Sequence, residues 1–365
     1  MVRFLHTADW QMGLKASQMG LKAREVREKR FETIARIAKL ARDERVDFVV
    51  IAGDTFDDND IDEGVVKRTV DQLNGLAPVP VFVLPGNHDH LCPGSVWTRP
   101  GWRAAGPSVH LLERPEEVEV GDGVVLYPCP LSQKRTSQDP TGWIPPRRPG
   151  DARIRVGVAH GGMSILPRQV NFPIPVNRSE LSGLDYLALG DWHGLRENGR
   201  ACYPGTPEPT AFDEADPGNV LIVEIQSAGD TPKVLSRRVA LLRWVVEEQT
   251  ISDPTDVRAL DERVKGLGAA PELVLRVRPK LDSALPKEIV EDLKVLRKAW
   301  SDSCFFLDWP EEGLGENPSD GGPLPDGLLF EADTALAARA ASGGKSAIVA
   351  EARSLLRRFT QEART

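Results

Sequence analysis

Five short apolar segments, each followed directly by polar residues, recur along the first 194 residues of the chain. They are VRFLHTAD at 2–9, FVVIAGD at 48–54, VFVLPGNHD at 81–89, IRVGVAHGG at 154–162 and LDYLALGDWHG at 184–194. Their Val, Ile, Leu and Phe content over four to six residues is typical of strands buried on both faces. Amphipathic segments at about 22–45 and 62–75 predict helices between the first three strands. This alternation predicts an α/β fold.

Polar residues stand at the end of each predicted strand. In open α/β sheets the ligand crevice lies beyond the carboxyl ends of the strands, so we expect these side chains to meet at one edge. A single histidine in such a place is most often structural, but three of the six histidines of this chain follow buried strands in glycine-flanked turns. The candidate residues are Asp9, Gln11, Asp54, Asn87, His88, His160, Asp191 and His193.

This set of side chains predicts a metal centre. Carboxylate, imidazole and amide oxygen ligands together suit Mn, Fe or Zn. One carboxylate, that of Asp54, can bridge two ions. Two ions about 3.5–4 Å apart clamp a phosphodiester and activate water near neutral pH. The pattern therefore favours phosphoester chemistry.

The pattern changes after residue 220. Strand and helix segments alternate over about 244–310, which predicts a small α+β domain after a first domain at 1–243. A segment rich in Gly, Pro and acidic residues at 311–327 predicts a linker. An Ala-rich helical tail follows at 328–365. The tail is either a helix packed on this chain or an amphipathic helix that docks on a partner.

Composition narrows the classes of protein. The net charge of -8 is a weak argument against nucleic acid as a substrate, because bound cations would reverse the sign locally. Four scattered cysteines predict neither disulfides nor a cysteine-bound zinc. The absence of a long apolar run or a leader predicts a cytoplasmic protein without a membrane span. The basic segment 134–155 is either a solvated loop face or a rim that contacts phosphates.

The strand-end motifs, taken in order, resemble a known set. DWQ at 9–11, GDTFDD at 53–58, GNHD at 86–89, AHGG at 159–162 and GDWHG at 190–194 are similar to the motifs of calcineurin-like metallophosphoesterases. YPGTPEPTAF at 203–212 and the small domain at 244–310 resemble the corresponding parts of SbcD-like DNA repair nucleases. The resemblance covers about 1–310. It implies a four-layer α-β-β-α core with a smaller α+β capping domain.

The resemblance also implies roles for the strand-end residues. One metal would be held by Asp9, Gln11, Asp54 and His193, and the other by Asp54, Asn87, His160 and Asp191. His88 would act as a catalytic residue that protonates the leaving oxygen or stabilises the charged transition state. We further expect Asp57, three residues after Asp54, to orient His88.

Two positions depart from the family pattern. The first motif usually reads Asp-x-His and the last Gly-His-x-His, whereas this chain has Gln11 and Asp191 in place of imidazoles. The change favours harder ions, so manganese is the expected metal, with Fe, Mg and Zn as alternatives. It also weakens the Gln11 site. A scaffold without catalytic activity is the alternative interpretation.

Three functions remain at this point. The first is a two-metal DNA phosphodiesterase, an exonuclease or endonuclease of DNA repair, with a coiled-coil ATPase partner of the SbcC type and a homodimeric state. The second is a phosphodiesterase or phosphatase of nucleotides and other small molecules, and the third is a non-catalytic protein that binds DNA ends. Trp10 and Trp192 either pack at the strand ends or stack on a base. The expected substrate-binding residues are Arg135, Arg147, Arg148, Trp10 and Trp192.

Overall fold

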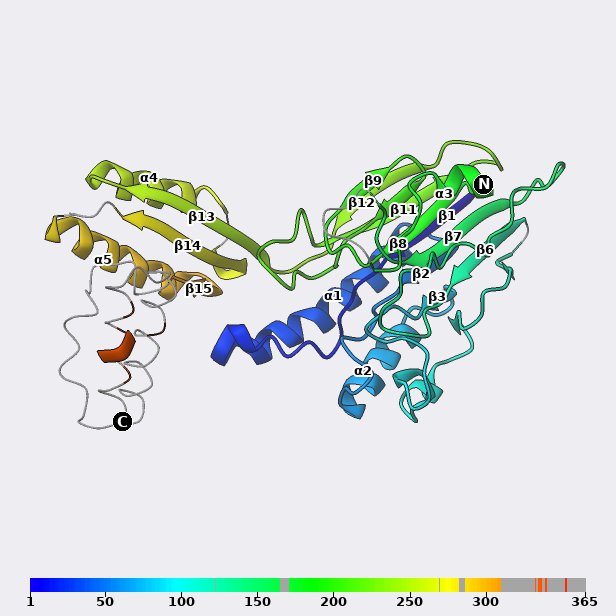
Figure 1. Ribbon diagram of the computed structural model, residues 1–365, viewed down its shortest axis with the longest axis horizontal. Coiled ribbons are helices and arrows are strands. Elements are labelled where there is room, and N and C mark those ends of the chain that lie inside the picture. Colours follow the sequence, from blue (N-terminus) through cyan, green and yellow to red (C-terminus); the bar gives the residue numbers. More distant parts are fainter. Residues whose placement is uncertain are drawn as a thin grey trace. The chain divides into compact units, whose positions relative to one another are not determined.

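The chain forms two compact units. The structure is a computed structural model that describes residues 1–121, 123–164, 171–268, 270–281 and 286–309, with a few positions between 332 and 352. The first unit comprises Met1–Val245 and Pro271–Leu275, and the second comprises Val246–Ala270 and Arg276–Thr365 (Figure 1). The predicted linker at 311–327 and nearly all of the predicted tail at 328–365 lie outside the described residues.

Two six-stranded sheets build the first unit. The first sheet has the order β12-β11-β1-β2-β3-β4, with β1 Val2–Thr7, β2 Phe48–Ala52, β3 Val81–Leu84, β4 Val109–Leu111, β11 Asn219–Ile225 and β12 Lys233–Arg238. The second has the order β5-β6-β7-β8-β10-β9, with β5 Val118–Glu119, β6 Val124–Cys129, β7 Ile154–His160, β8 Tyr186–Gly190, β9 Arg196–Asn198 and β10 Ala201–Tyr203. Strands β1 to β4 are parallel to one another, and so are β6 to β8. All five predicted strands are confirmed.

Helices α1 (Ala23–Asp43) and α2 (Glu63–Asn74) cover the first sheet and confirm the two predicted helices. Each buries one stripe, because apolar side chains three or four positions apart share a helix face. On α1 these include Ile34 and Ile37, and on α2 they include Val66 and Val70, which join the core on the outer face of the sheet. The α/β class is thereby confirmed.

The two sheets pack face to face over a second core. Phe4 of β1 stacks on Phe48 of β2 with ring centroids 4.9 Å apart, and Tyr186 of β8 meets Phe4 edge-on across the interface. The outer face of the second sheet is covered differently. Among the described residues its cover is one short helix, α3 (Arg178–Ser182), with loop residues such as Ile144. The fourth layer is therefore mostly loop.

The second unit has the predicted order of strands and helices. Strands β13 (Arg243–Ile251), β14 (Leu273–Leu281) and β15 (Phe306–Asp308) form one sheet, and β13 and β14 begin in the first unit. Helices α4 (Pro254–Lys265) and α5 (Lys287–Ser303) contact each other, and Asp253 caps α4 through the backbone N–H groups of its first turn. Short 3-10 helices complete the described elements: η1 Ser17–Lys22, η2 Val96–Thr98, η3 Trp102–Ala104 and η4 Ala270–Glu272. No helix in these described ranges combines the length and hydropathy that a bilayer span requires.

Candidate metal centre

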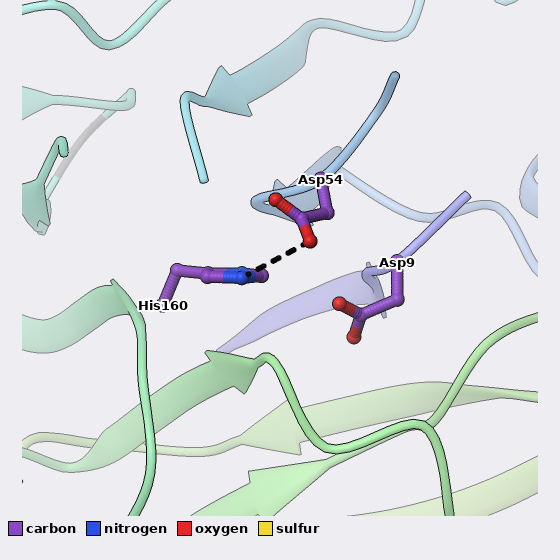
Figure 2. A group of neighbouring side chains, drawn as sticks. All are labelled: Asp9, Asp54 and His160. Carbon is purple, nitrogen blue, oxygen red and sulfur yellow. Dashed lines mark ion pairs between the residues drawn. The ribbon is translucent and has the colours of Figure 1, made fainter. Parts of the chain in front are cut away.

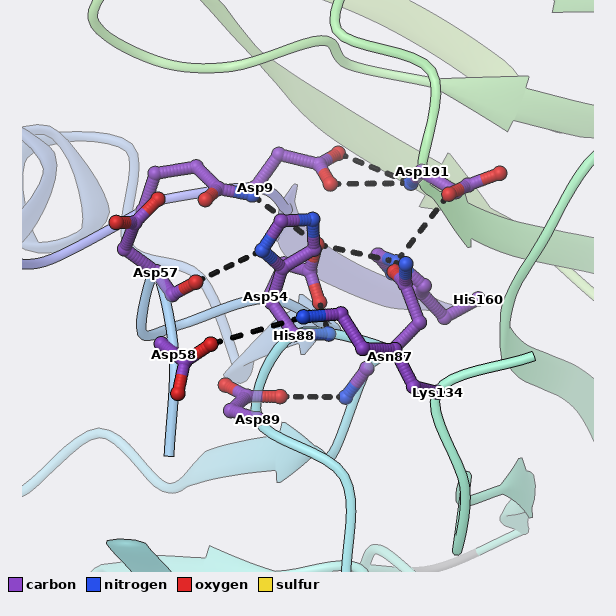
Figure 3. Close-up of polar contacts among 12 residues, drawn as sticks. Asp9, Asp54, Asp57, Asp58, Asn87, His88, Asp89, Lys134, His160 and Asp191 are labelled. Carbon is purple, nitrogen blue, oxygen red and sulfur yellow. Dashed lines mark hydrogen bonds and ion pairs between the residues drawn. The ribbon is translucent and has the colours of Figure 1, made fainter. Parts of the chain in front are cut away.

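The strand-end side chains meet where the carboxyl ends of both sheets face one another. Asp9 follows β1, Asp54 follows β2 and Asn87 follows β3, all from the first sheet. His160 ends β7 and Asp191 follows β8, both from the second sheet. Figure 2 shows Asp9, Asp54 and His160 facing a common point, and Figure 3 adds Asn87 and Asp191 around it. The convergence is a consequence of parallel strand order in two packed sheets.

The backbone turns sharply at these residues. Asp9, Gln11, Asp54 and Asp191 all have positive φ, which non-glycine residues rarely adopt. Gly53 has a φ of 94°, and a Cβ there would lie 2.1 Å from Nδ1 of His160. Strained backbone of this kind is concentrated at functional sites, where the surrounding structure holds it in place.

His160 forms the centre of one half of the site. Its Nδ1–H donates to the backbone oxygen of Ala52 at 2.9 Å, which directs Nε2 at the other side chains. Nε2 lies 2.7 Å from Oδ1 of Asn87, 3.4 Å from Oδ2 of Asp54 and 3.8 Å from Oδ1 of Asp191. These four side chains are the set expected to hold one metal.

The other half contains Asp9, Gln11 and His193. One ligand atom from each of Asp9, Asp54 and His160 lies within 4.8 Å of the others, so Asp9 and Asp54 are close neighbours. Both oxygens of Asp9 accept from the backbone N–H of Asp191, at 3.1 and 3.2 Å. The Gln11 side chain contacts Oδ2 of Asp54 at 3.0 Å through its amide nitrogen. The structure thus brings Asp9 and Gln11 to Asp54, and His193 interacts electrostatically with the carboxylates of Asp9 and Asp54.

The electrostatics of this cluster fit a cation. Burial raises the pKa of Asp9 to about 6, although His160 and His193 oppose the rise. Burial would also raise the pKa of Asp54, but His160 and His88 hold it at about 2. The carboxylates in turn raise the pKa of His160 well above its ordinary value, against the effect of burial. Buried carboxylates that depend on imidazolium groups for compensation are suited to divalent ions, which replace those protons.

His88 stands beside the cluster with a side chain that is 38% exposed. Its Nδ1–H donates to the backbone oxygen of Asp57 at 2.7 Å, and its Nε2 lies 4.0 Å from Oδ2 of Asp54. Asp57, which was expected to orient His88, contacts it through the backbone carbonyl and not through the carboxylate. Nε2 remains directed toward the site (Figure 3).

Two side chains that the sequence interpretation did not single out support the centre. Asp89 is fully buried and accepts from the backbone N–H of Gly86 at 2.7 Å and of Phe56 at 3.0 Å, which ties two ligand loops together. Glu214 lies 2.8 Å from Nδ1 of His193. Asp89 belongs to the GNHD motif and was detectable there. Glu214 had no local signal, because only the fold brings it to His193.

The predicted substrate-binding residues have different positions. Lys134, from the loop after β6, reaches over the site to within 3.7 Å of Asp58, and the adjacent Arg135 is exposed. Arg147 is a structural residue instead, because its guanidinium pairs with Asp185 at 2.6 Å and donates to three backbone carbonyls. Asp185 directly precedes β8, at the edge of the sheet opposite the metal centre.

Arg148 is exposed and directly follows Arg147 at that opposite edge. A contact of Arg147 or Arg148 with substrate stays a prediction.

The two tryptophans in the metal motifs differ in burial. Trp10 is buried in the core beneath α1, and its indole N–H donates to Thr7 at 2.9 Å. Stacking of Trp10 on a base is thus excluded by burial, and the packing interpretation is correct. Trp192 is half-buried and packs against the core on the outer face of the second sheet.

Comparisons with known proteins agree with this centre. Residues 2–223 match the calcineurin-like phosphoesterase family. The chain is 26% identical over 338 residues to the uncharacterised metallophosphoesterase YhaO of Bacillus subtilis, covering 84% of this chain and 80% of YhaO. It is 30% identical over 258 residues to the DNA double-strand break repair protein Mre11 of Aeropyrum pernix, covering 64% of this chain and 59% of Mre11.

A shorter match involves SbcD, one polypeptide of the nuclease SbcCD of Bacillus subtilis. The identity is 29% over 92 residues, which cover 24% of this chain and 22% of SbcD. The chain therefore spans most of YhaO but less than two thirds of either Mre11 or SbcD. The family match extends over more than half of the chain and includes every strand that contributes to the centre. This chain belongs to the calcineurin-like phosphoesterase family and is a metal-dependent hydrolase of phosphate esters.

Proposed function

We propose that this protein hydrolyses phosphodiester bonds of DNA with two divalent ions, best supplied as manganese, in a DNA repair role. The observation that carries the proposal is the buried group of Asp9, Asp54 and His160, whose ligand atoms lie within 4.8 Å of one another. The names of two relatives, a nuclease and a DNA repair protein, support DNA as the substrate. In the proposed site Asp54 would be a ligand of both ions. One ion would be held by Asp9, Gln11, Asp54 and His193, and the other by Asp54, Asn87, His160 and Asp191.

The bound ions would supply Lewis-acid activation of the phosphate and of the attacking water. His88 supplies the proton for the leaving oxygen, because its Nδ1–H is held by the carbonyl of Asp57 and its Nε2 faces the cluster. Lys134 places an ammonium group at the mouth of the site, where a flanking phosphate would pass. The Lys134–Asp58 pair is exposed, so phosphate can replace Asp58 at small cost.

The donor set favours manganese. The proposed ligands include four oxygen donors and two imidazoles. The oxygen donors are Asp9, Asp54, Asn87 and Asp191, and the imidazoles are His160 and His193. Oxygen-rich sets favour harder ions over zinc. Gln11 is a weaker donor than the imidazole of the family pattern, whereas Asp191 supplies a carboxylate in place of the other imidazole, so the site that contains Gln11 is the weaker of the two.

Partners follow from the relatives. SbcD is by its name one component of a larger nuclease. We infer that this chain also works with a coiled-coil ATPase of the SbcC type and as a homodimer, with the small domain from 244 to 310 as the counterpart of the capping domain of SbcD-like nucleases. Arg135, exposed beside Lys134, is one arginine candidate for a DNA contact.

The test is an assay of the purified chain with Mn, Mg or Zn on single-stranded DNA, double-stranded DNA and bis-p-nitrophenyl phosphate. We expect Mn-dependent cleavage of DNA, loss of it in Asp54→Ala, and a fall of about 10²–10⁴-fold in kcat for His88→Ala. The matched control is Asp60→Ala, which removes a fully exposed carboxylate from the same loop. Turnover of the small ester without DNA cleavage would favour a small-molecule phosphodiesterase. DNA binding without turnover of either substrate would favour a non-catalytic role in binding DNA ends.

A further inference from the structure

The turn that carries His193 is held by one later segment of the chain. The backbone oxygen of His193 accepts from the N–H of Thr206 at 3.0 Å, and a Cβ at Gly205 would lie 2.6 Å from that same oxygen. Leu195 donates to the backbone oxygen of Ala215 at 3.1 Å. The segment 205–215 therefore fixes the backbone of His193 from both sides.

The same segment also contacts the imidazole. Oε1 of Glu214 lies 2.8 Å from Nδ1 of His193, and the Glu214 side chain is only 5% exposed. Oε1 also accepts from the hydroxyl of Thr210, while Oε2 accepts from the backbone N–H of Thr210 at 2.9 Å. The carboxylate has lost its rotational freedom and offers Nδ1 a fixed anionic acceptor.

This contact decides which nitrogen of His193 is free. A proton on Nδ1 bonded to Glu214 leaves the Nε2 lone pair for a ligand, and the negative acceptor makes that lone pair more basic. His160 has the same arrangement with a neutral acceptor, the backbone oxygen of Ala52 at 2.9 Å. The charged acceptor therefore contacts the histidine whose proposed site contains Gln11, and the neutral acceptor contacts the histidine of the other site.

We propose that Glu214 is a positioning residue that acts through His193 and sets the affinity of the metal site containing Gln11. The inference rests on the ligand assignment of the proposed function. Gln11 is a weaker donor than the imidazole that the family pattern has at this position, so more of the affinity of this site depends on the basicity and orientation of His193. Removal of such an outer acceptor lowers metal affinity by about 10–100-fold.

The experiment measures Mn²⁺ binding to the metal-free full-length protein by calorimetry, with the spin-coupled Mn²⁺ pair followed by electron paramagnetic resonance. For wild type we expect two ions per chain, bound with unequal affinity. In Glu214→Ala we expect the weaker site to lose about 10–100-fold in affinity, the stronger site to remain unchanged and the coupled signal to need correspondingly more Mn²⁺. Glu214→Gln is nearly isosteric and still offers an acceptor, so its Mn²⁺ affinity at the weaker site should lie between those of wild type and Glu214→Ala.

Asp213→Ala is the matched control, because it removes the adjacent carboxylate and should leave both affinities unchanged. In saturating Mn²⁺, Glu214→Gln should recover most of the wild-type kcat, because only its Mn²⁺ requirement has changed. If the substitution only destabilised the loop, kcat would stay reduced even in saturating Mn²⁺.

The outcomes separate this inference from the proposed function. Wild type that binds fewer than two ions, or a His193→Ala variant that keeps both sites at full affinity, would overturn the ligand assignment itself. If wild type binds two ions and His193→Ala weakens one, yet both Glu214 variants bind like wild type, the assignment stands and the role of Glu214 is refuted. Equal weakening of both sites in Glu214→Gln would also refute it, since Glu214 contacts only one of the two histidines.

Discussion

Replacement of Asp9 by asparagine should stabilise the metal-free protein while it removes activity. Asp9 is fully buried beside Asp54, and burial raises its pKa from the ordinary value of 3.8 to about 6. A raised carboxylate pKa means that the charged form is disfavoured in the folded state, so ionisation of Asp9 lowers stability. The substitution keeps the size of the side chain and removes the charge.

The magnitude follows from the two pKa values. Their difference corresponds to about 3 kcal/mol of destabilisation, to order of magnitude, once Asp9 is ionised in the folded and unfolded states. The cost is absent below pH 3.8, grows between pH 3.8 and about 6, and is constant above that. In the first unit, of about 250 residues, this amounts to a rise in Tm of about 6–12 °C for Asp9→Asn at pH 8.

The assay is thermal unfolding of wild type and Asp9→Asn in chelator at pH 8 and at pH 5, followed by the same scans with Mn²⁺. We expect the variant to be the more stable without metal, by a smaller margin at pH 5, and to gain less from Mn²⁺ because it lacks a ligand. Asp185→Asn is the control. Asp185 is equally buried but is compensated by Arg147 at 2.6 Å, so its loss should destabilise with or without metal. A metal-free Asp9→Asn protein that melts below wild type at pH 8 would refute the reasoning.

Three further predictions concern the same centre. Burial lowers the pKa of His193, but the hydrogen bond to Glu214 and the charges of nearby carboxylates outweigh it and raise the pKa to about 9. Mn²⁺ must therefore displace a proton from His193, and the Mn²⁺ affinity of this site should rise about tenfold from pH 7 to pH 8. Calorimetry in buffers of different ionisation enthalpy would detect the released proton. Gly53→Ala places a Cβ against His160 at a positive φ, so it should lower the free energy of unfolding in denaturant by about 3 kcal/mol and weaken Mn²⁺ binding. An unchanged free energy of unfolding and Mn²⁺ affinity would show that the loop relaxes. Lys134→Ala should raise KM for DNA and lower the slope of log K against log salt concentration by about 1, whereas Lys233→Ala on edge strand β12 serves as the control. Equal effects of the two variants would exclude a specific contact between Lys134 and DNA.

The sequence by itself determined where the chemistry lies. A buried strand can be recognised from a short apolar segment of the sequence. Such segments directly precede the polar motifs that contain Asp9, Asp54, Asn87 and His160. Parallel strands bring their carboxyl ends to one edge, so the gathering of Asp9, Asp54 and Asn87 could be predicted from strand order. His160 joins them only because the second sheet packs on the first. The α/β class and the order of elements in both units were predictable for the same reason, since they depend on periodicity along the chain.

Contacts between distant segments were decided only by the tertiary structure. The sequence does not show that Trp10 packs beneath α1 or that Arg147 pairs with Asp185 at the far edge of the sheet. Nor does it show that the carbonyl of Asp57, and not its carboxylate, accepts the hydrogen bond from His88. It also does not show Glu214, which reaches His193 because the segment 205–215 wraps the turn after β8. Periodicity fixes the face on which a side chain lies within its own element, whereas its partners depend on how separate sheets and loops pack, and that packing is a property of the whole fold.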